Sequence, residues 1–172
     1  MITRQHTKGD APSFAVFSDC EKYRYSLTRI WDRTAPRVLV VMLNPSTADE
    51  MRNDPTVERC EQRARRLGYG AFQVTNIFAF RATDPRDMRA AQDPVGPEND
   101  GVLLDGTVWA DHIIAAWGVH GAHLDRGMEV ADALAQTGVP LFHLGLSKAG
   151  HPRHPLYLPY AQQPVTWTPS RR

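Results

Sequence analysis

The chain has 172 residues, 42% of them hydrophobic, which is enough for one domain spanning residues 1–172 to bury a substantial core. Its formal net charge of +1 argues against a protein that grips a nucleic-acid duplex through a broadly basic surface, so any nucleic-acid contact must be local. Two cysteines, a polar N-terminus and the lack of an apolar run of about 18 residues predict a cytoplasmic protein without a disulfide framework, an export signal or a membrane span, and they leave the oligomeric state open.

The first predicted elements are two aromatic and β-branched runs at residues 14–18 and 23–30. A short polar segment separates them, and the second run alternates apolar and polar side chains. This pattern predicts an antiparallel hairpin with one face in water. The next apolar run, at 37–43, is continuous and stops at Asn44-Pro45, which is typical of a central strand buried on both faces.

Helical and strand patterns alternate from there to residue 146. Asp54 can cap an amphipathic helix with Pro55 in its first turn, and Gly68 ends this helix. A polar loop is expected from Thr83 to Pro97. The remaining predicted elements are strands at 71–80, 112–117 and 140–146 and helices near 103–108 and 128–135.

This alternation predicts an α/β protein: a three-layer α/β/α fold with a central, mainly parallel four-stranded sheet, preceded by the N-terminal β-hairpin. Sheets of this kind bind ligands in a crevice outside the carboxyl ends of their strands. Four strand ends then converge on one crevice. They lie at Asn44, Asn76, Trp117-Gly118 and the segment from Ser147 onward.

Motifs for several common chemistries are missing from the sequence. No strand is followed by a glycine-rich dinucleotide fingerprint, no P-loop is present, and residues 145–150 lack the spacing of a hydrolase nucleophile elbow. His143, His151 and His154 have no other histidine or carboxylate at a spacing familiar from zinc sites. We therefore expect neither a metal nor a cofactor.

Five sequence words occur in one order over most of the chain: LNPSTAD (43–49), NDPT (53–56), VTNIFAFRATDP (74–85), AWG (116–118) and GHPRHPLYL (150–158). Together they are similar to a bacterial family, the domain of unknown function 1643 (DUF1643) family. The order of the strand-end loops also resembles that of the uracil-DNA glycosylase superfamily. This resemblance implies a uracil-DNA-glycosylase-like fold, a nucleic acid or nucleotide as partner, and hydrolysis of an N-glycosidic bond.

The resemblance implies roles for residues at the strand ends. Asn44 resembles the residue that positions a water in mismatch-specific glycosylases, and Asn76 resembles the one that reads the Watson–Crick edge of the base. Trp117 ends the third parallel strand as in those enzymes. Either His151 or His154 stands where a histidine contacts the leaving base, and both alignments stay open. The other candidate substrate contacts are Pro45, Ser46, Thr47, Phe78, Arg81 and Arg153, and Asp49 is the candidate acid.

The sequence departs from active glycosylases in two places. The activating aspartate of uracil-DNA glycosylases is missing at the Asn44 position, and their His-Pro-Ser loop is replaced by residues 151–156 (HPRHPL). Structural explanations also exist: Asn44 as a turn former, Asn76 as a buried amide and Trp117 as a core aromatic. We therefore carry two hypotheses. One is a nucleobase-recognising hydrolase of N-glycosidic bonds in DNA or modified nucleotides, and the other is a non-catalytic nucleic-acid or nucleotide binding module.

Overall fold

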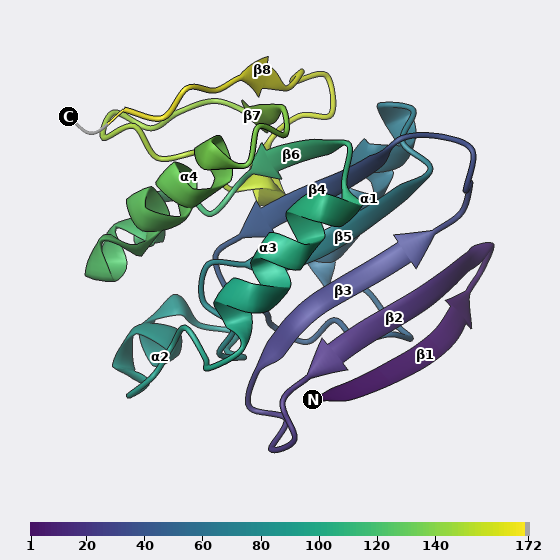
Figure 1. Ribbon diagram of the computed structural model, residues 1–172, viewed down its shortest axis with the longest axis horizontal. Coiled ribbons are helices and arrows are strands. Elements are labelled where there is room, and N and C mark those ends of the chain that lie inside the picture. The colour runs from purple at the N-terminus through teal and green to yellow at the C-terminus, as the bar shows by residue number, and fades with distance from the viewer. Residues whose placement is uncertain (171–172) are drawn as a thin grey trace.

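The computed structural model describes residues 1–170, and the strands of these residues form one mixed sheet (Figure 1). The eight strands are β1 (Ile2–Lys8), β2 (Ala11–Phe17), β3 (Arg24–Ile30), β4 (Arg37–Met42), β5 (Ala71–Asn76), β6 (His112–Ala115), β7 (Leu141–His143) and β8 (Val165–Thr166). Their order across the sheet is β1-β2-β3-β5-β4-β6-β7-β8. Strands β5, β4, β6 and β7 are parallel, whereas β3 is antiparallel to β5 and β8 to β7.

Helices cover both faces of this sheet (Figure 1). Within residues 1–170 the helices are α1 (Pro55–Arg66), α2 (Pro85–Ala90), α3 (Asn99–Trp109) and α4 (Arg126–Gln136), with 3-10 segments η1 (Val119–Asp125) and η2 (Pro155–Tyr157). Helix α1 packs on one face, and α3 and α4 pack on the other. The predicted start of α1 is confirmed: the Asp54 carboxylate accepts a hydrogen bond from the Val57 amide at 2.9 Å, and Pro55 occupies the first turn.

Strand β4 separates the two halves of the core, as its continuous apolar run predicts. Leu39 and Val41 face α3 and α4, whereas Val38 and Val40 face α1, and all four side chains are buried. Burying an aliphatic side chain of this size stabilises a fold by about 1.5–3 kcal/mol. Burial of these side chains therefore stabilises the centre of the sheet, which supports the loops that follow its strands.

The N-terminal hairpin extends the sheet, which corrects the prediction of four strands. Its two predicted strands pair as β2 and β3, and β3 pairs further with β5. The prediction of a wet face on β3 is wrong: Arg24, Ser26 and Thr28 are all buried. Thr28 is buried because α3 lies over β3, and its hydroxyl accepts a hydrogen bond from the Gln73 side chain at 3.0 Å. Arg24 is buried because it reaches the loop after β4 and donates to the Ala48 carbonyl oxygen.

Several short elements were not predicted from the sequence: β1, α2, η1 and β8. Helix α2 begins at Asp84-Pro85, inside the expected loop, with the Asp84 carboxylate accepting from the Arg86 amide at 2.8 Å. Its six residues are too few to show a helical period. No helix among the described residues has the length and apolarity that a membrane crossing requires.

Candidate functional site

The parallel strands end at one edge of the sheet, on the left-hand side of Figure 1. Strand β4 lies between β5 and β6, and the chain passes from β4 to β5 before returning to β6. The direction of winding therefore reverses beside the end of β4, which is where open α/β sheets form a crevice. The loops after β4, β5, β6 and β7 surround this position.

The loop after β4 is joined to the segment that follows β5. Asn44 Nδ2 donates to the carbonyl oxygen of Ala82 at 2.8 Å, and the Ala82 amide donates to Pro45 O at 2.9 Å. The Ser46 and Thr83 hydroxyls lie 3.2 Å apart. These bonds fix the Asn44 amide plane, while its Oδ1 accepts no hydrogen bond from residues 1–170. The arrangement leaves an oriented acceptor at the end of β4.

Two buried arginines from β3 hold the rest of this loop. Arg24 donates to the carbonyl oxygen of Ala48 at 2.6 Å, and burial lowers the pKa of Arg24 to about 10. Arg29 donates to the Asp49 carbonyl at 2.7 Å, and to Asn53 Oδ1 at 2.8 Å. Charged donors make stronger hydrogen bonds than neutral ones, so this loop is firmly placed.

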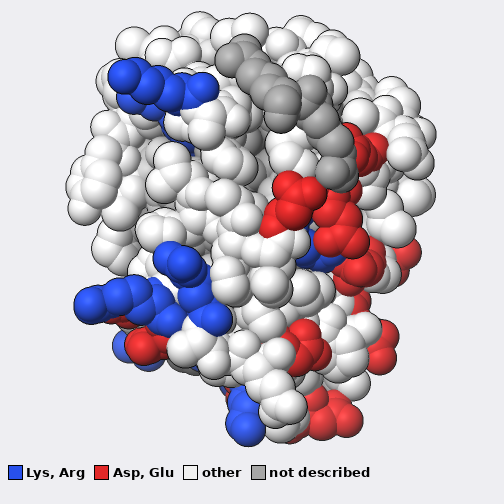
Figure 2. Space-filling view, turned by 90° about the vertical axis from the view of Figure 1, so that its left-hand side faces the viewer, with Lys and Arg blue, Asp and Glu red and all other residues white. Residues whose placement is uncertain are grey.

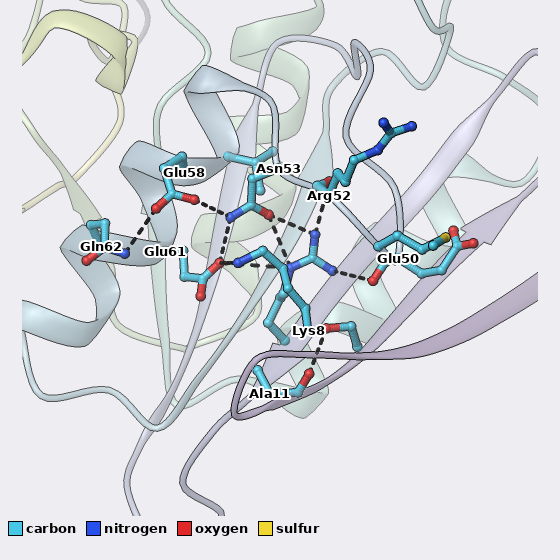
Figure 3. A network of polar contacts seen from close by, with 12 residues as sticks. Lys8, Ala11, Glu50, Arg52, Asn53, Glu58, Glu61 and Gln62 are labelled. Carbon is cyan, nitrogen blue, oxygen red and sulfur yellow. Dashed lines mark hydrogen bonds and ion pairs between the residues drawn. The ribbon is translucent and has the colours of Figure 1, made fainter.

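Arg29 belongs to a wider network between β3, α1 and the loop after β4, through its hydrogen bonds to Asp49 and Asn53. Figure 3 shows this network, with Asn53, Glu58 and Glu61 among its labelled members. Arg29 forms an ion pair with Glu61: Arg29 Nε lies 3.9 Å from Glu61 Oε2, and both side chains are buried. Glu61 also accepts from Asn53 at 2.7 Å, while Lys8 contacts Glu61 from the N-terminal segment. A single sequence offers no signal for this network, because its members are distant along the chain.

The candidate acid Asp49 is engaged in a turn. Its Oδ1 accepts from the amides of Met51 and Arg52 at 2.9 and 2.8 Å. These bonds close the loop locally, in the way that aspartates commonly stabilise turns. The Asp49 carboxylate therefore stabilises the loop, and its catalytic role stays a prediction.

His154 lies at the meeting point of three loops. Its backbone stands against Gly118 at the end of β6, whose amide donates to Pro152 O at 2.7 Å. Its Nδ1 accepts from the Leu156 amide at 3.4 Å, which places the proton of the neutral ring on Nε2. Burial lowers the pKa of His154; the nearby charge of Asp54 opposes this shift, and His120 adds to it.

His151 sits in a closed turn after β7. The Ser147 amide donates to His151 O at 2.9 Å, and the His151 amide donates to the Ser147 hydroxyl at 3.2 Å. Its Nδ1 is buried without a partner among residues 1–170. A buried nitrogen of this kind usually finds a partner, so the ring has an unused hydrogen-bonding position.

A cleft of about 640 Å³ opens between the loops after β6 and β7. Its size falls within the range of small-molecule sites. No described Asp or Glu side chain lines it, and Tyr157 beside it is 91% exposed. The polar and aromatic side chains that line it are Ser147, Lys148, His151, Arg153, His154 and Tyr157. The structure thus brings the predicted His151, Arg153 and His154 together.

Charge is divided across this face of the molecule. Figure 2, which faces the left-hand side of Figure 1, shows Lys and Arg gathered on the left of the view and Asp and Glu on the right. An anionic ligand is therefore attracted to one part of the face and repelled by the other.

Three of the predicted substrate contacts are core residues. Trp117 is 1% exposed and packs against Trp167, with ring centroids 5.7 Å apart. Phe78 is buried in the same cluster. Asn76 is buried as well; its backbone oxygen accepts from Asn99 at 2.8 Å, and its Nδ2 has no partner within residues 1–170. Base stacking on Phe78 or base reading by Asn76 therefore requires the protein to open.

The other predicted contacts, on the loop after β4 and the segment after β5, do not line the cleft. Pro45 is buried and Thr47 is exposed in the loop after β4. Arg81 donates to the Glu21 carbonyl at 3.1 Å and lies over the Phe17 ring, 5.1 Å from its centroid, on the hairpin side of the sheet. These residues do not meet His154 in the present conformation.

The arginines of α1 form a contact that the sequence did not indicate. Acidic residues interspersed among them favour a solvated helix face, but Arg59 and Arg66 lie over the Tyr160 ring, 4.0 and 3.9 Å from its centroid. Arg63 is buried and donates to Leu158 O and Gln162 O. The arginines thus hold the segment 158–162, which continues the wall of the cleft.

Residues 1–170 contain no group of three His, Cys, Asp or Glu side chains placed to hold a metal ion. The two cysteines have different environments. Cys20 is exposed, whereas Cys60 is buried, and burial raises the pKa of the Cys60 thiol to about 12. The polar side chains that line the cleft supply imidazole, hydroxyl and cationic groups.

Comparison with known proteins gives a family but no activity. No curated protein matches the chain. One solved structure, an alpha/beta hydrolase from Novosphingobium aromaticivorans DSM 12444, is similar at 15% identity and a TM-score of 0.33, over 84% of this chain and 44% of the hydrolase. That likeness is too weak to carry an argument. The sequence pattern of a protein family of unknown function, DUF1643, matches residues 24–156. The chain belongs to the DUF1643 family.

Proposed function

We propose that the cleft between the loops after β6 and β7 binds a nucleotide or nucleic acid, and that the protein hydrolyses an N-glycosidic bond of this ligand. The observation that carries the proposal is the lining of the cleft. Cationic Lys148 and Arg153 suit phosphate, and Tyr157 offers an exposed aromatic face on which a base can stack. The absence of a described carboxylate from the lining favours an anionic ligand.

The reaction assigns separate roles to the two sides of the crevice. Asn44 Oδ1 would accept a hydrogen bond from water and orient its oxygen toward the anomeric carbon of the sugar. As the carbon–oxygen bond forms, the carbon–nitrogen bond breaks, and its electron pair passes to the base, which takes the proton released from water. A neutral His154 would donate from Nε2 to the developing charge on the base. The uracil-DNA-glycosylase-like fold remains part of this proposal.

The second candidate function is a binding module without turnover. Two observations favour it: the Asp49 carboxylate is engaged in a turn, and Asn76 is buried away from the cleft. Such a module would use the same cleft to hold a nucleotide. Binding is therefore common to both candidates, and base release separates them.

Base release tests the enzyme directly. Duplex and single-stranded oligonucleotides that carry uracil, mismatched thymine, hypoxanthine or bulky modified pyrimidines are incubated with the protein, and free base is measured. An enzyme should release one of these bases, and Asn44→Ala and His154→Gln should each slow release by about 100-fold. Met51→Ala, an exposed residue in the same loop as Asn44, is the control that should leave the rate unchanged.

Release that persists in both variants would contradict the assigned roles. No release from any substrate, together with measurable binding of the same oligonucleotides, would favour the binding module. The absence of both release and binding would overturn the proposed function.

A further inference from the structure

A second hollow adjoins the cleft on the other side of Val119. It has a volume of about 350 Å³, which also lies within the range of ligand sites. Val119 lines both spaces, so the two are neighbours with this residue between them. The second hollow lies between the C-terminal turn of α2 and η1. Its lining residues are Arg89, Val119, His120, Ala122, His123 and Leu124.

The polar lining of the second hollow resembles that of the cleft in chemistry. Arg89, His120 and His123 supply guanidinium and imidazole donors, and no described Asp or Glu lines it. The charge of His120 acts on the pKa of both Asp84 and His154. The Asp84 charge is compensated by Arg86, whose guanidinium contacts it at 2.7 Å. An anionic group in this hollow thus meets donors rather than an uncompensated carboxylate.

The backbone that walls this hollow is strained, and its apolar side chains face water. Leu124 and Asp125 have φ values of +57° and +54°, in the left-handed region that side chains rarely adopt. Leu124 is 66% exposed and Val119 is 58% exposed, although both are large and apolar. The His123 ring packs against the Phe78 ring, with centroids 5.6 Å apart. Strain of this kind collects at ligand sites.

We propose that the second hollow binds the neighbouring nucleotide of a single-stranded nucleic acid, with Arg89 and His120 contacting its phosphate. The ligand of the cleft is then a strand of at least two nucleotides rather than a free nucleotide. This inference rests on the proposed function, because the first nucleotide occupies the cleft. Consecutive units of one strand fit two adjoining hollows that share Val119.

The charge distribution assigns a single strand rather than a duplex. A duplex covers a broad surface and needs a correspondingly broad set of cations. The chain has a net charge of only +1, and acidic side chains occupy the right of the face in Figure 2. Neighbouring hollows with cationic side chains, and an exposed aromatic side chain, Tyr157, at the cleft, provide the groups that single-strand binding uses.

Fluorescence anisotropy with three probes tests the inference: labelled thymidine monophosphate, a labelled eight-nucleotide single-stranded thymidine oligomer, and the same oligomer in a duplex. The double variant Arg89→Gln/His120→Gln changes two exposed residues of the second hollow. It should weaken binding of the single strand about tenfold and leave binding of the mononucleotide unchanged. The slope of log affinity against log salt concentration should become shallower by about 0.7 for each phosphate that the variant no longer neutralises.

Two further variants distinguish binding in the second hollow from binding in the cleft. Lys148→Gln/Arg153→Gln changes the cleft and should weaken both single-strand and mononucleotide binding. Arg33→Gln removes one exposed arginine before β4, at the opposite edge of the sheet, and should alter neither. Unchanged single-strand binding by Arg89→Gln/His120→Gln, or tighter binding of the duplex, would overturn the inference while leaving the cleft intact. Failure of the wild type to bind any of the three probes would contradict the proposed function itself.

Discussion

Gly118 lies directly against His154, and a side chain at position 118 would crowd this histidine. A Cβ there would stand 3.2 Å from the Cβ of His154. The backbone of Gly118 has φ +76° and ψ −173°, a conformation that is essentially restricted to glycine. The end of β6 and the histidine loop after β7 can therefore touch, and the Gly118 amide reaches Pro152 O.

Replacing this glycine should damage both stability and the cleft. Gly118→Ala is expected to lower the free energy of unfolding by about 2–3 kcal/mol, because it adds a contact with His154 to the strain of the backbone. Gly138→Ala is the control, since Gly138 also has φ +76° but nothing within 4 Å of the added carbon. Chemical denaturation of both variants measures the difference. Equal losses would show that the Gly118–His154 approach has no energetic weight.

The pKa of His154 should make stability depend on pH. Burial holds this pKa below the ordinary 6.5 of histidine. Because the folded-state value is the lower one, the stabilising contribution is complete above about pH 6.5 and is lost as the pH falls toward the folded-state pKa. Denaturation between about pH 5 and pH 7.5 should show this loss. His154→Gln should lose less stability than the wild type over the same interval.

A second variant identifies the charge that acts on His154. Asp54→Asn keeps a good helix cap for α1 but removes the charge that opposes the shift. Nuclear magnetic resonance titration of the His154 ring should therefore give a still lower pKa in Asp54→Asn than in the wild type. A higher value in the variant would contradict the effect assigned to the Asp54 charge.

Sequence patterns were most informative where one strand or helix carries its own signal. The run at 37–43 indicated a strand buried on both faces, and Asp54-Pro55 marked the start of α1. The prediction failed for β3, because the alternation of apolar and polar side chains from Tyr23 to Thr28 indicated a strand with one solvent-exposed face. Burial of Arg24 on that strand depends on the Ala48 carbonyl, a partner that no local pattern reveals.

The functional site, like the fold, could be predicted from the sequence only in part. The histidine loop stood out because His151, Arg153 and His154 lie between prolines, and the structure brings these three to one cleft. Lys148 and the hollow beyond Val119 gave no signal, because their meaning depends on how the loops after β5, β6 and β7 converge. Spatial neighbours from separate loops are not visible in a single sequence.

Arg29 should be among the most important residues for stability. It is fully buried, bonded to the loop after β4 and paired with buried Glu61. Glu61 keeps Lys8 and Arg65 as cationic partners, but Arg29→Met also removes the donor to the Asp49 and Glu50 carbonyl oxygens. The variant should therefore lower the free energy of unfolding by about 3–5 kcal/mol. Arg33→Met, at an exposed position, should change it by no more than about 0.5 kcal/mol. Similar values for the two variants would contradict the role assigned to the network of Figure 3.

Tyr160 should anchor the segment that continues the cleft wall. Its ring receives the Arg59 and Arg66 guanidinium groups, each worth about 0.5–1 kcal/mol at an exposed site. Tyr160→Ala is therefore expected to lose about 1–2 kcal/mol and to speed hydrogen exchange at residues 158–162. Tyr160→Phe keeps the aromatic ring and should behave like the wild type. If phenylalanine were as damaging as alanine, the ring contacts would not be the cause.

Chemical-shift mapping shows whether the cleft beside His154 holds a nucleotide. Thymidine monophosphate is titrated into ¹⁵N-labelled protein, and the amide signals are followed. Saturable shifts are expected at Gly118, Ser147 and Arg153, and they should weaken in Lys148→Gln/Arg153→Gln. Shifts confined to the opposite edge of the sheet, around Arg33, or no shifts at all, would mean that the cleft does not bind the nucleotide.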